Sequence, residues 1–152
     1  MGATVGDLLR ARVRLHGIQV GRPVDVILDR EQRRALGFEV HCGDDERRFL
    51  PFAVARFGDD TLAITSSLLL LDRSELRFYT DRGSPFTSLR HTPVHRDGRL
   101  LGPLADVRLS AGGEIEAWAG RPVAAERRLR DSYELCKRLG DKRYIEVATN
   151  LA

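Results

Sequence analysis

Residues 13–29 read VRLHGIQVGRPVDVILD, and residues 94–110 read VHRDGRLLGPLADVRLS, 81 positions later. Both glycines, the aspartate and most apolar positions coincide when the two stretches are superimposed. A second pair of short segments supports the repeat, because Arg56-Phe57-Gly58-Asp59 returns as Arg138-Leu139-Gly140-Asp141. An internal repeat at a fixed spacing indicates one structural unit present twice. We therefore expect two related modules in this chain.

The local pattern of each module predicts short β-strands. Apolar and polar residues alternate with period two over residues 24–28 and again over 36–40, and a polar run separates them. Period-two alternation is typical of strands, and short strands divided by glycine-containing turns favour a small barrel. The sequence thus predicts an all-β protein made of two small antiparallel β-barrels in tandem.

A different pattern separates the two modules. Asp72 is a suitable N-cap and Gly83 a suitable stop for a short helix, with Pro85 just beyond. We expect a first repeat over residues 1–71, a short helical connector over 72–88 and a second repeat over 89–152. Residues 68–71 are four leucines, which we expect to form a core shared by the modules, since such a run is seldom left in water.

Composition limits the class of protein. Cys42 and Cys136 do not form a CxxC pair, which is typical of a reducing compartment. No apolar run is long enough to span a membrane, and the first residues lack the features of a secretory leader. We expect a cytoplasmic protein without membrane insertion. Residues 1–76 hold 11 basic and 12 acidic side chains, net −1, whereas residues 77–152 hold 14 and 10, net +4, so the second half is the better candidate for contact with a polyanion.

The repeated motif resembles that of the PRC-barrel family. The family pattern Gly-x-x-x-Asp-Val is matched at residues 21–26 and at 102–107, and residues 47–51, RRFLP, match a later segment before a Gly-Asp turn. The family includes the cytoplasmic domain of the photosynthetic reaction-centre H subunit and the C-terminal domain of a ribosome maturation factor. The resemblance implies tandem PRC-type barrels that serve as binding and assembly modules.

The residues that could carry chemistry have structural interpretations. Asp25 and Asp106 occupy equivalent places in both repeats, which favours a hydrogen-bonding role at a turn or strand end over a catalytic pair. We give the same turn or strand-end role to the remaining repeated positions: Gly17, Gly21, Gly58, Gly98, Gly102 and Gly140. The adjacent His41-Cys42, and the pair His91 and His95 with Pro93 between them, lack the spacing of a zinc site. We expect no catalytic residues, no metal and no cofactor, and hence no enzyme.

Three features are candidates for interaction surfaces. In a strand, side chains alternate between the two faces, so Trp118 points outward if Ile115 and Ala117 point inward. The indole could instead close a barrel seam. Ile27 faces away from the apolar positions beside it, although it could pack under the connector. Arg127, Arg128 and Arg130 form the densest basic cluster, although Glu126 and Asp131 could neutralise it.

Two functions follow as hypotheses. The first is a non-catalytic adaptor that binds a protein partner or a second copy of the chain through exposed barrel edges. The alternative is binding of ribosomal RNA, or of a ribosomal protein within a ribonucleoprotein, in ribosome maturation through the basic second half. The absence of an aromatic pair on adjacent strands for stacking bases favours the first hypothesis.

Overall fold

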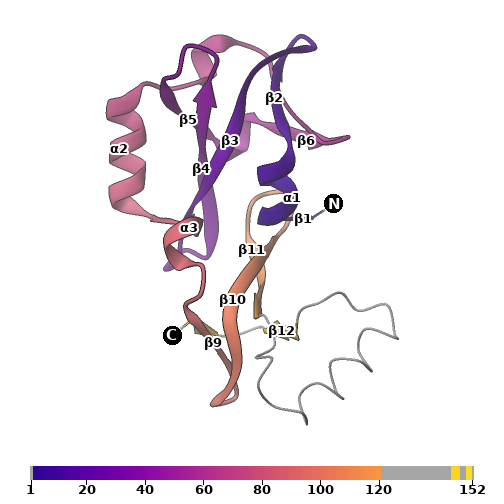
Figure 1. Cartoon of the computed structure of the whole chain (residues 1–152), viewed down its shortest axis with the longest axis vertical. Helices are drawn as coiled ribbons and strands as arrows, with labels where there is room; N and C mark the ends of the chain where they lie inside the picture. Colours follow the sequence, from indigo (N-terminus) through magenta and orange to yellow (C-terminus); the bar gives the residue numbers. More distant parts are fainter. Residues whose placement is uncertain (1, 121–144, 148–149, 152) are drawn as a thin grey trace. The chain divides into compact units, whose positions relative to one another are not determined.

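The computed structural model describes residues 2–120, 145–147 and 150–151. These residues are mostly β and are arranged in two sheets (Figure 1). The chain divides into two compact units. The first contains residues 1–88 and 109–115, and the second contains residues 89–108 and 116–152. The connector predicted at 72–88 therefore belongs to the first unit, together with a loop from the second half of the sequence.

The sheet of the first unit has the strand order β5-β4-β3-β2-β7-β6, and β8 pairs with β3. Its strands are β2 (Arg12–Leu15), β3 (Ile18–Asp29), β4 (Arg34–Cys42), β5 (Arg47–Pro51), β6 (Arg56–Gly58), β7 (Thr61–Ile64) and β8 (Ser84–Pro85). All pairings are antiparallel except that of β2 with β7, which is parallel. Within the described residues β5 and β6 do not pair, so the sheet is open and mixed, whereas a closed antiparallel sheet was expected.

Short helices surround this sheet. They are α1 (Val5–Arg10), which follows β1 (Ala3–Thr4), the 3-10 turns η1 (Phe52–Val54) and η2 (Ser67–Leu69), α2 (Arg73–Arg82) and α3 (Phe86–Leu89). The predicted helix is confirmed as α2. Asp72 accepts hydrogen bonds from the N–H groups of Ser74 and Glu75 at 3.0 and 3.1 Å, and Gly83 is the C-cap. The capping residues thus define both ends of α2.

The central strands of the second sheet repeat the order of those of the first. Its strands are β9 (Pro93–Arg96), β10 (Arg99–Leu109), β11 (Ile115–Gly120), β12 (Ile145–Val147) and β13 (Asn150–Leu151), with the sheet order β12-β11-β10-β9-β13. Strands β9, β10 and β11 begin 81 positions after β2, β3 and β4, and β8 and α3 begin 81 positions after β1 and α1. The structural repeat therefore starts about ten residues before the repeat that the sequence reveals.

Fine details of backbone geometry also repeat. The β2–β3 turn, His16-Gly17, has φ values of 50° and 83°, and the β9–β10 turn, Asp97-Gly98, has φ values of 51° and 77°. Such left-handed pairs make the tight turns that suit the twist of a hairpin. In each hairpin one residue of the longer strand has no partner in the strand register, namely Val20 in β3 and Leu101 in β10. The same bulge at the same place bends both hairpins alike.

Two apolar layers stabilise the first unit, one on each face of its sheet. Side chains such as Phe38, Val40 and Leu62 are almost fully buried on one face. On the other face, Ile27, Phe49 and Leu76 form a cluster with Tyr79 and Leu71 packed against it, and the Tyr79 ring stacks on Phe49 with ring centroids 4.2 Å apart. Helix α2 supplies Leu76 and Tyr79 and therefore covers this second face.

The four leucines at 68–71 do not form the shared core that we expected. The Leu68 side chain is 84% exposed in η2. Leu71 is tied to the first unit, because its N–H and C=O both bond to the backbone of Phe49. Its side chain packs against the apolar cluster beneath α2. The four leucines thus lead the chain into α2, and of Leu68 and Leu71 only Leu71 contributes to the apolar layer beneath this helix.

Candidate functional site

Trp118 is not the exposed anchor that period two predicted. Its side chain is only 4% exposed. It shares its face of β11 with Gly120, and a Cβ on Gly120 would lie 3.6 Å from the Cβ of Val94 in β9, although β10 separates these strands in the sheet. The sheet of the second unit is therefore strongly curled at this point. The prediction of an outward Trp118 is wrong because both faces of β11 hold buried side chains.

Ile27 is also buried, with no exposed surface. It points to the face of β3 opposite the main core, as the alternation predicted. That face is covered by α2, and the C-cap Gly83 approaches so closely that a Cβ there would lie 2.8 Å from an Ile27 methyl group. The prediction of an exposed Ile27 is wrong because the connector packs on the strand. Ile27 belongs to the fold and is not available to a partner.

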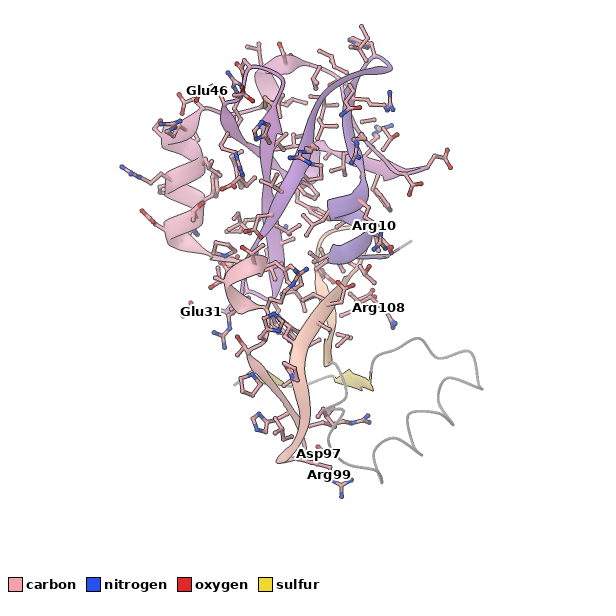
Figure 2. The ribbon with its side chains drawn as sticks, viewed as in Figure 1. Arg10, Glu31, Glu46, Asp97, Arg99 and Arg108 are labelled. Carbon is pink, nitrogen blue, oxygen red and sulfur yellow. The ribbon has the colours of Figure 1, made fainter. Side chains whose placement is uncertain are left out.

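The basic cluster Arg127, Arg128 and Arg130 lies outside the described residues, as does Gly140. In the part of the second unit that the structure describes, exposed arginines occur on the β9–β10 hairpin at Arg96, Arg99 and Arg108. Figure 2 labels Asp97 and Arg99 at the tip of this hairpin. Acidic and basic groups are thus mixed at that tip.

Asp25 and Asp106 are buried acceptors within strands, so the prediction of a turn or strand-end position is wrong. Their side chains are 7% and 8% exposed, and each accepts a hydrogen bond from the N–H of the following valine, at 2.9 and 2.8 Å. Asp25 also accepts hydrogen bonds from the Thr87 N–H at 3.2 Å and from the Thr87 hydroxyl at 2.5 Å. Asp25 therefore anchors α3 to β3 inside the first unit. Buried carboxylates with several donors are typical of structural roles.

The repeated glycines divide into two groups. Gly17 and Gly98 occupy the hairpin turns, as predicted, and Gly58 ends β6 directly before the turn into β7. Gly21 and Gly102 lie inside β3 and β10, each beside the residue without a partner in the strand register, and not at the predicted turn or strand end. At Gly21 a Cβ would lie 2.8 Å from a Val40 methyl group. A close approach of strands explains this glycine.

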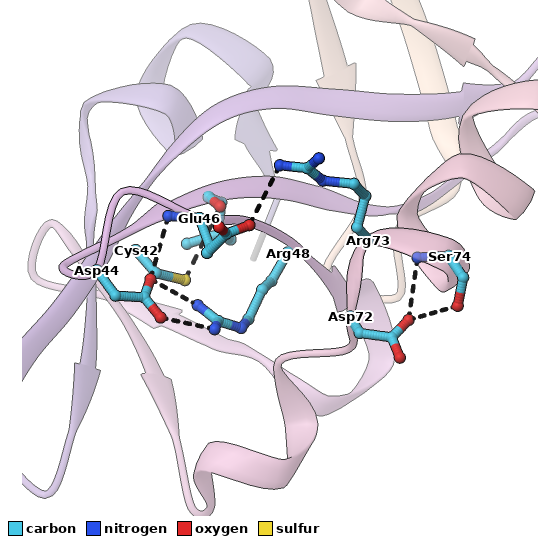
Figure 3. A network of polar contacts seen from close by, with 8 residues as sticks. Cys42, Asp44, Glu46, Arg48, Asp72, Arg73 and Ser74 are labelled. Carbon is cyan, nitrogen blue, oxygen red and sulfur yellow. Dashed lines mark hydrogen bonds and ion pairs between the residues drawn. The ribbon is translucent and has the colours of Figure 1, made fainter.

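A network of polar contacts surrounds the β4–β5 turn (Figure 3). Both Asp44 carboxylate oxygens accept hydrogen bonds from the Arg48 guanidinium, at 2.8 and 2.7 Å, and these bonds hold the pKa of Asp44 well below its ordinary value. Arg73 at the start of α2 contacts Glu46 at 3.2 Å. Arg48 is half-buried, the other groups are exposed, and all are paired with one another. The network therefore closes the turn and leaves these charged groups already paired.

The histidines do not gather into a site. His41 Nε2 lies 3.1 Å from Asp45, and neither His91 nor His95 belongs to a cluster suited to a metal. Among the side chains that the structure describes, no group of three or more His, Cys, Asp or Glu could hold a metal ion. The buried thiol of Cys42 contacts the carbonyl of Val40 at 3.9 Å.

The exposed edge that the adaptor hypothesis requires is found at β6, a strand that the sequence did not single out. This strand ends the sheet order and pairs with β7 alone in the described part of the chain, as Figure 1 shows at the margin of the first unit. All three of its residues are exposed, and the Phe57 side chain is 40% exposed. Val54, three positions earlier, is 37% exposed. An edge strand with an exposed aromatic residue is a template for pairing with another strand.

The register of β6 fixes what this edge presents. Phe57 lies opposite Leu62 of β7, which in turn lies opposite Val13 of β2. Leu62 and Val13 are buried, so Phe57 extends the apolar face of the sheet to its rim. The two-residue turn Asp59-Asp60 makes Gly58 and Thr61 the hydrogen-bonded pair, and because such pairs alternate, the N–H and C=O of Phe57 point away from β7.

Phe57 could have been singled out from the sequence by its place in the repeated Arg-x-Gly-Asp element, directly before a tight turn. Nothing local, however, indicates that β6 is the last strand of its sheet, since this depends on the distant pairing of β2 with β7. Whether a strand lies at the edge of a sheet depends on the strand order, and the period-two alternation of side chains does not reveal that order.

Comparisons with known proteins add no functional assignment. No protein-family model matches the chain, and no curated protein matches it. Among the described residues, no helix is long and apolar enough to cross a membrane. The free edge of β6 is the candidate functional site, and the register and exposure of its residues identify it.

Proposed function

We propose that this protein is a non-catalytic assembly module that binds another protein strand along the edge of β6. The observation that carries the proposal is the register of β6 on β7, from which the N–H and C=O of Phe57 point outward beside an aromatic side chain that is 40% exposed. Strand addition to a free edge uses main-chain hydrogen bonds for affinity and the flanking side chains for specificity.

The proposal includes the architecture that the family resemblance implies, namely two PRC-type modules in tandem. The identical turn and bulge in the β2–β3 and β9–β10 hairpins support a common origin for the two modules. The curl of the second sheet at Gly120 and the burial of Trp118 support a barrel-like form for that unit. Binding without catalysis is the role that the resemblance implies for such modules.

The alternative proposal, binding to ribosomal RNA or a ribonucleoprotein, draws on the exposed Arg96, Arg99 and Arg108 of the second unit. Phosphate contacts by arginine release counterions, so this binding would weaken steeply as salt is raised. The described charges are mixed, because Asp97 lies 4.0 Å from Arg96. We therefore place protein binding first.

Affinity purification of the full chain from its native cell, with and without nuclease, tests the two proposals. We expect a discrete protein to co-purify, to resist nuclease and to be lost with Phe57→Ser. The matched control is Phe78→Ser, because Phe78 is a 54% exposed phenylalanine on α2 and not on β6. Retention that nuclease abolishes, or a partner that Phe57→Ser does not affect, would contradict protein binding at β6.

A further inference from the structure

The segment 55–60, Ala-Arg-Phe-Gly-Asp-Asp, carries charges of opposite sign at its two ends. Arg56 lies before Phe57, and Asp59 and Asp60 follow it. In the part of the chain that the structure describes, no carboxylate pairs with Arg56 and no cation pairs with either aspartate. All three residues are exposed. The charges flanking Phe57 are therefore available to a partner.

We propose that the strand that adds to β6 is β6 of a second copy of this chain, paired antiparallel about a two-fold axis at Phe57. This inference rests on the proposed function and names its partner. Phe57 offers its N–H and C=O to the same edge, so two copies can exchange both hydrogen bonds as one pair. A two-fold interface uses the same surface on both subunits, as this geometry requires.

Charge complementarity favours the antiparallel direction. When two β6 strands run in opposite directions, Arg56 of each copy approaches the Asp59-Asp60 turn of the other. A parallel arrangement would instead bring arginine beside arginine and aspartate beside aspartate. Opposite charges across strands stabilise a pair and like charges oppose it. The charge order along β6 thus selects the antiparallel pair.

The glycine that ends β6 leaves room for this contact. With the two Phe57 residues opposite each other, Arg56 of one copy lies directly opposite Gly58 of the other. A Cβ on Gly58 would meet nothing within 4 Å, so the space above it is open. The arginine stem can lie over this glycine while its guanidinium reaches the aspartates beyond.

The apolar face contributes the remaining contact. Phe57 of each copy lies on the face of Leu62 and Val13, so pairing brings the two phenylalanines together at the rim of two joined sheets. Aromatic pairs opposite each other on adjacent strands stabilise antiparallel sheets. A strand of three residues buries less than the roughly 1,200 Å² typical of a stable interface. We therefore expect a weak, concentration-dependent dimer.

Sedimentation equilibrium of the full chain tests the inference, over a range from about 10 µM to about 1 mM because the dimer is weak. We expect the wild type to dimerise, and Phe57→Ser to raise the dissociation constant by about tenfold or more, since it removes the central pair. Phe78→Ser should leave the dissociation constant unchanged.

A mixing experiment provides the sharpest control. Arg56→Glu alone places like charges at both ends of the pair and should abolish self-association, and Asp59→Lys with Asp60→Lys should do the same. An equimolar mixture of the two variants should associate, because each then meets the opposite charge on the other. Circular dichroism verifies that both variants remain folded. Association in the equimolar mixture would also show that both variants are folded.

The outcomes separate this inference from the proposed function. A mixture that fails to associate, or a dimer that Phe57→Ser leaves intact, would overturn pairing through β6. A wild type that stays monomeric while a different protein is captured in a Phe57-dependent manner would overturn the second copy as partner and leave protein binding at β6 standing. A monomeric wild type with no Phe57-dependent capture would overturn both.

Discussion

Replacing Ile27 by alanine should destabilise the first unit strongly. Ile27 has no exposed surface and packs with Phe49 and Leu76 beneath α2. Removing three buried carbons costs about 2.4 kcal/mol in transfer free energy at about 0.8 kcal/mol per methylene. The cavity left under the helix adds to this, so the expected loss is about 3 to 4 kcal/mol, within the range measured for buried Ile→Ala changes.

The matched control is Ile18→Ala, because Ile18 is the same residue type in the same strand and is 69% exposed. Exposed substitutions away from caps and networks change stability by about 0.5 kcal/mol or less. Urea unfolding monitored by circular dichroism measures both variants. If Ile27→Ala cost no more than Ile18→Ala, the packing of α2 on β3 would be refuted, and the exposed interface position expected from the sequence would be restored.

Three further predictions follow from the described contacts. Asp25→Asn should lower the free energy of unfolding by about 1 to 2 kcal/mol, and a double-mutant cycle with Thr87→Val should reveal coupling; an additive cycle would rule out the Asp25–Thr87 bonds. Arg48 lowers the pKa of Asp44, so the stability that the ionised Asp44 adds is complete above the ordinary pKa of 3.8 and is lost as pH falls below it. Asp44→Asn should therefore make the free energy of unfolding fall less steeply below pH 3.8. A pH profile that Asp44→Asn leaves unchanged would count against the Asp44–Arg48 pair. Gly113→Ala should destabilise the fold in thermal melts, since Gly113 has φ of 89° and a Cβ would lie 2.8 Å from the Phe52 ring; an unchanged melting temperature would contradict that contact.

Local sequence signals predicted those features whose causes are local. The hairpin turns at Gly17 and Gly98 follow from residues that tolerate positive φ, and the ends of α2 follow from Asp72 and Gly83. The repeat spacing of 81 predicted the equivalence of β2 and β3 with β9 and β10, because identical local patterns fold alike. Such features require no knowledge of what lies across the sheet.

The candidate site could not be predicted in this way, because alternation tells which residues share a face and not whether that face is covered. Ile27 does point away from the main core, but α2 packs there from a segment about fifty residues later. Asp25 finds its partner Thr87 at a sequence separation of 62. Phe57 lies on a free edge because β7, and not β6, pairs with β2. These outcomes depend on tertiary contacts between distant segments.

Hydrogen exchange at the Phe57 amide tests the central claim most directly. That N–H points away from β7 and is unprotected in a monomer, whereas the N–H of Gly58 belongs to the closing pair of the hairpin. We predict that exchange at Phe57 slows as the concentration of the full chain is raised, while exchange at Gly58 changes little. Rapid exchange at Phe57 that is independent of protein concentration and of added cell extract would contradict strand pairing at the edge of β6.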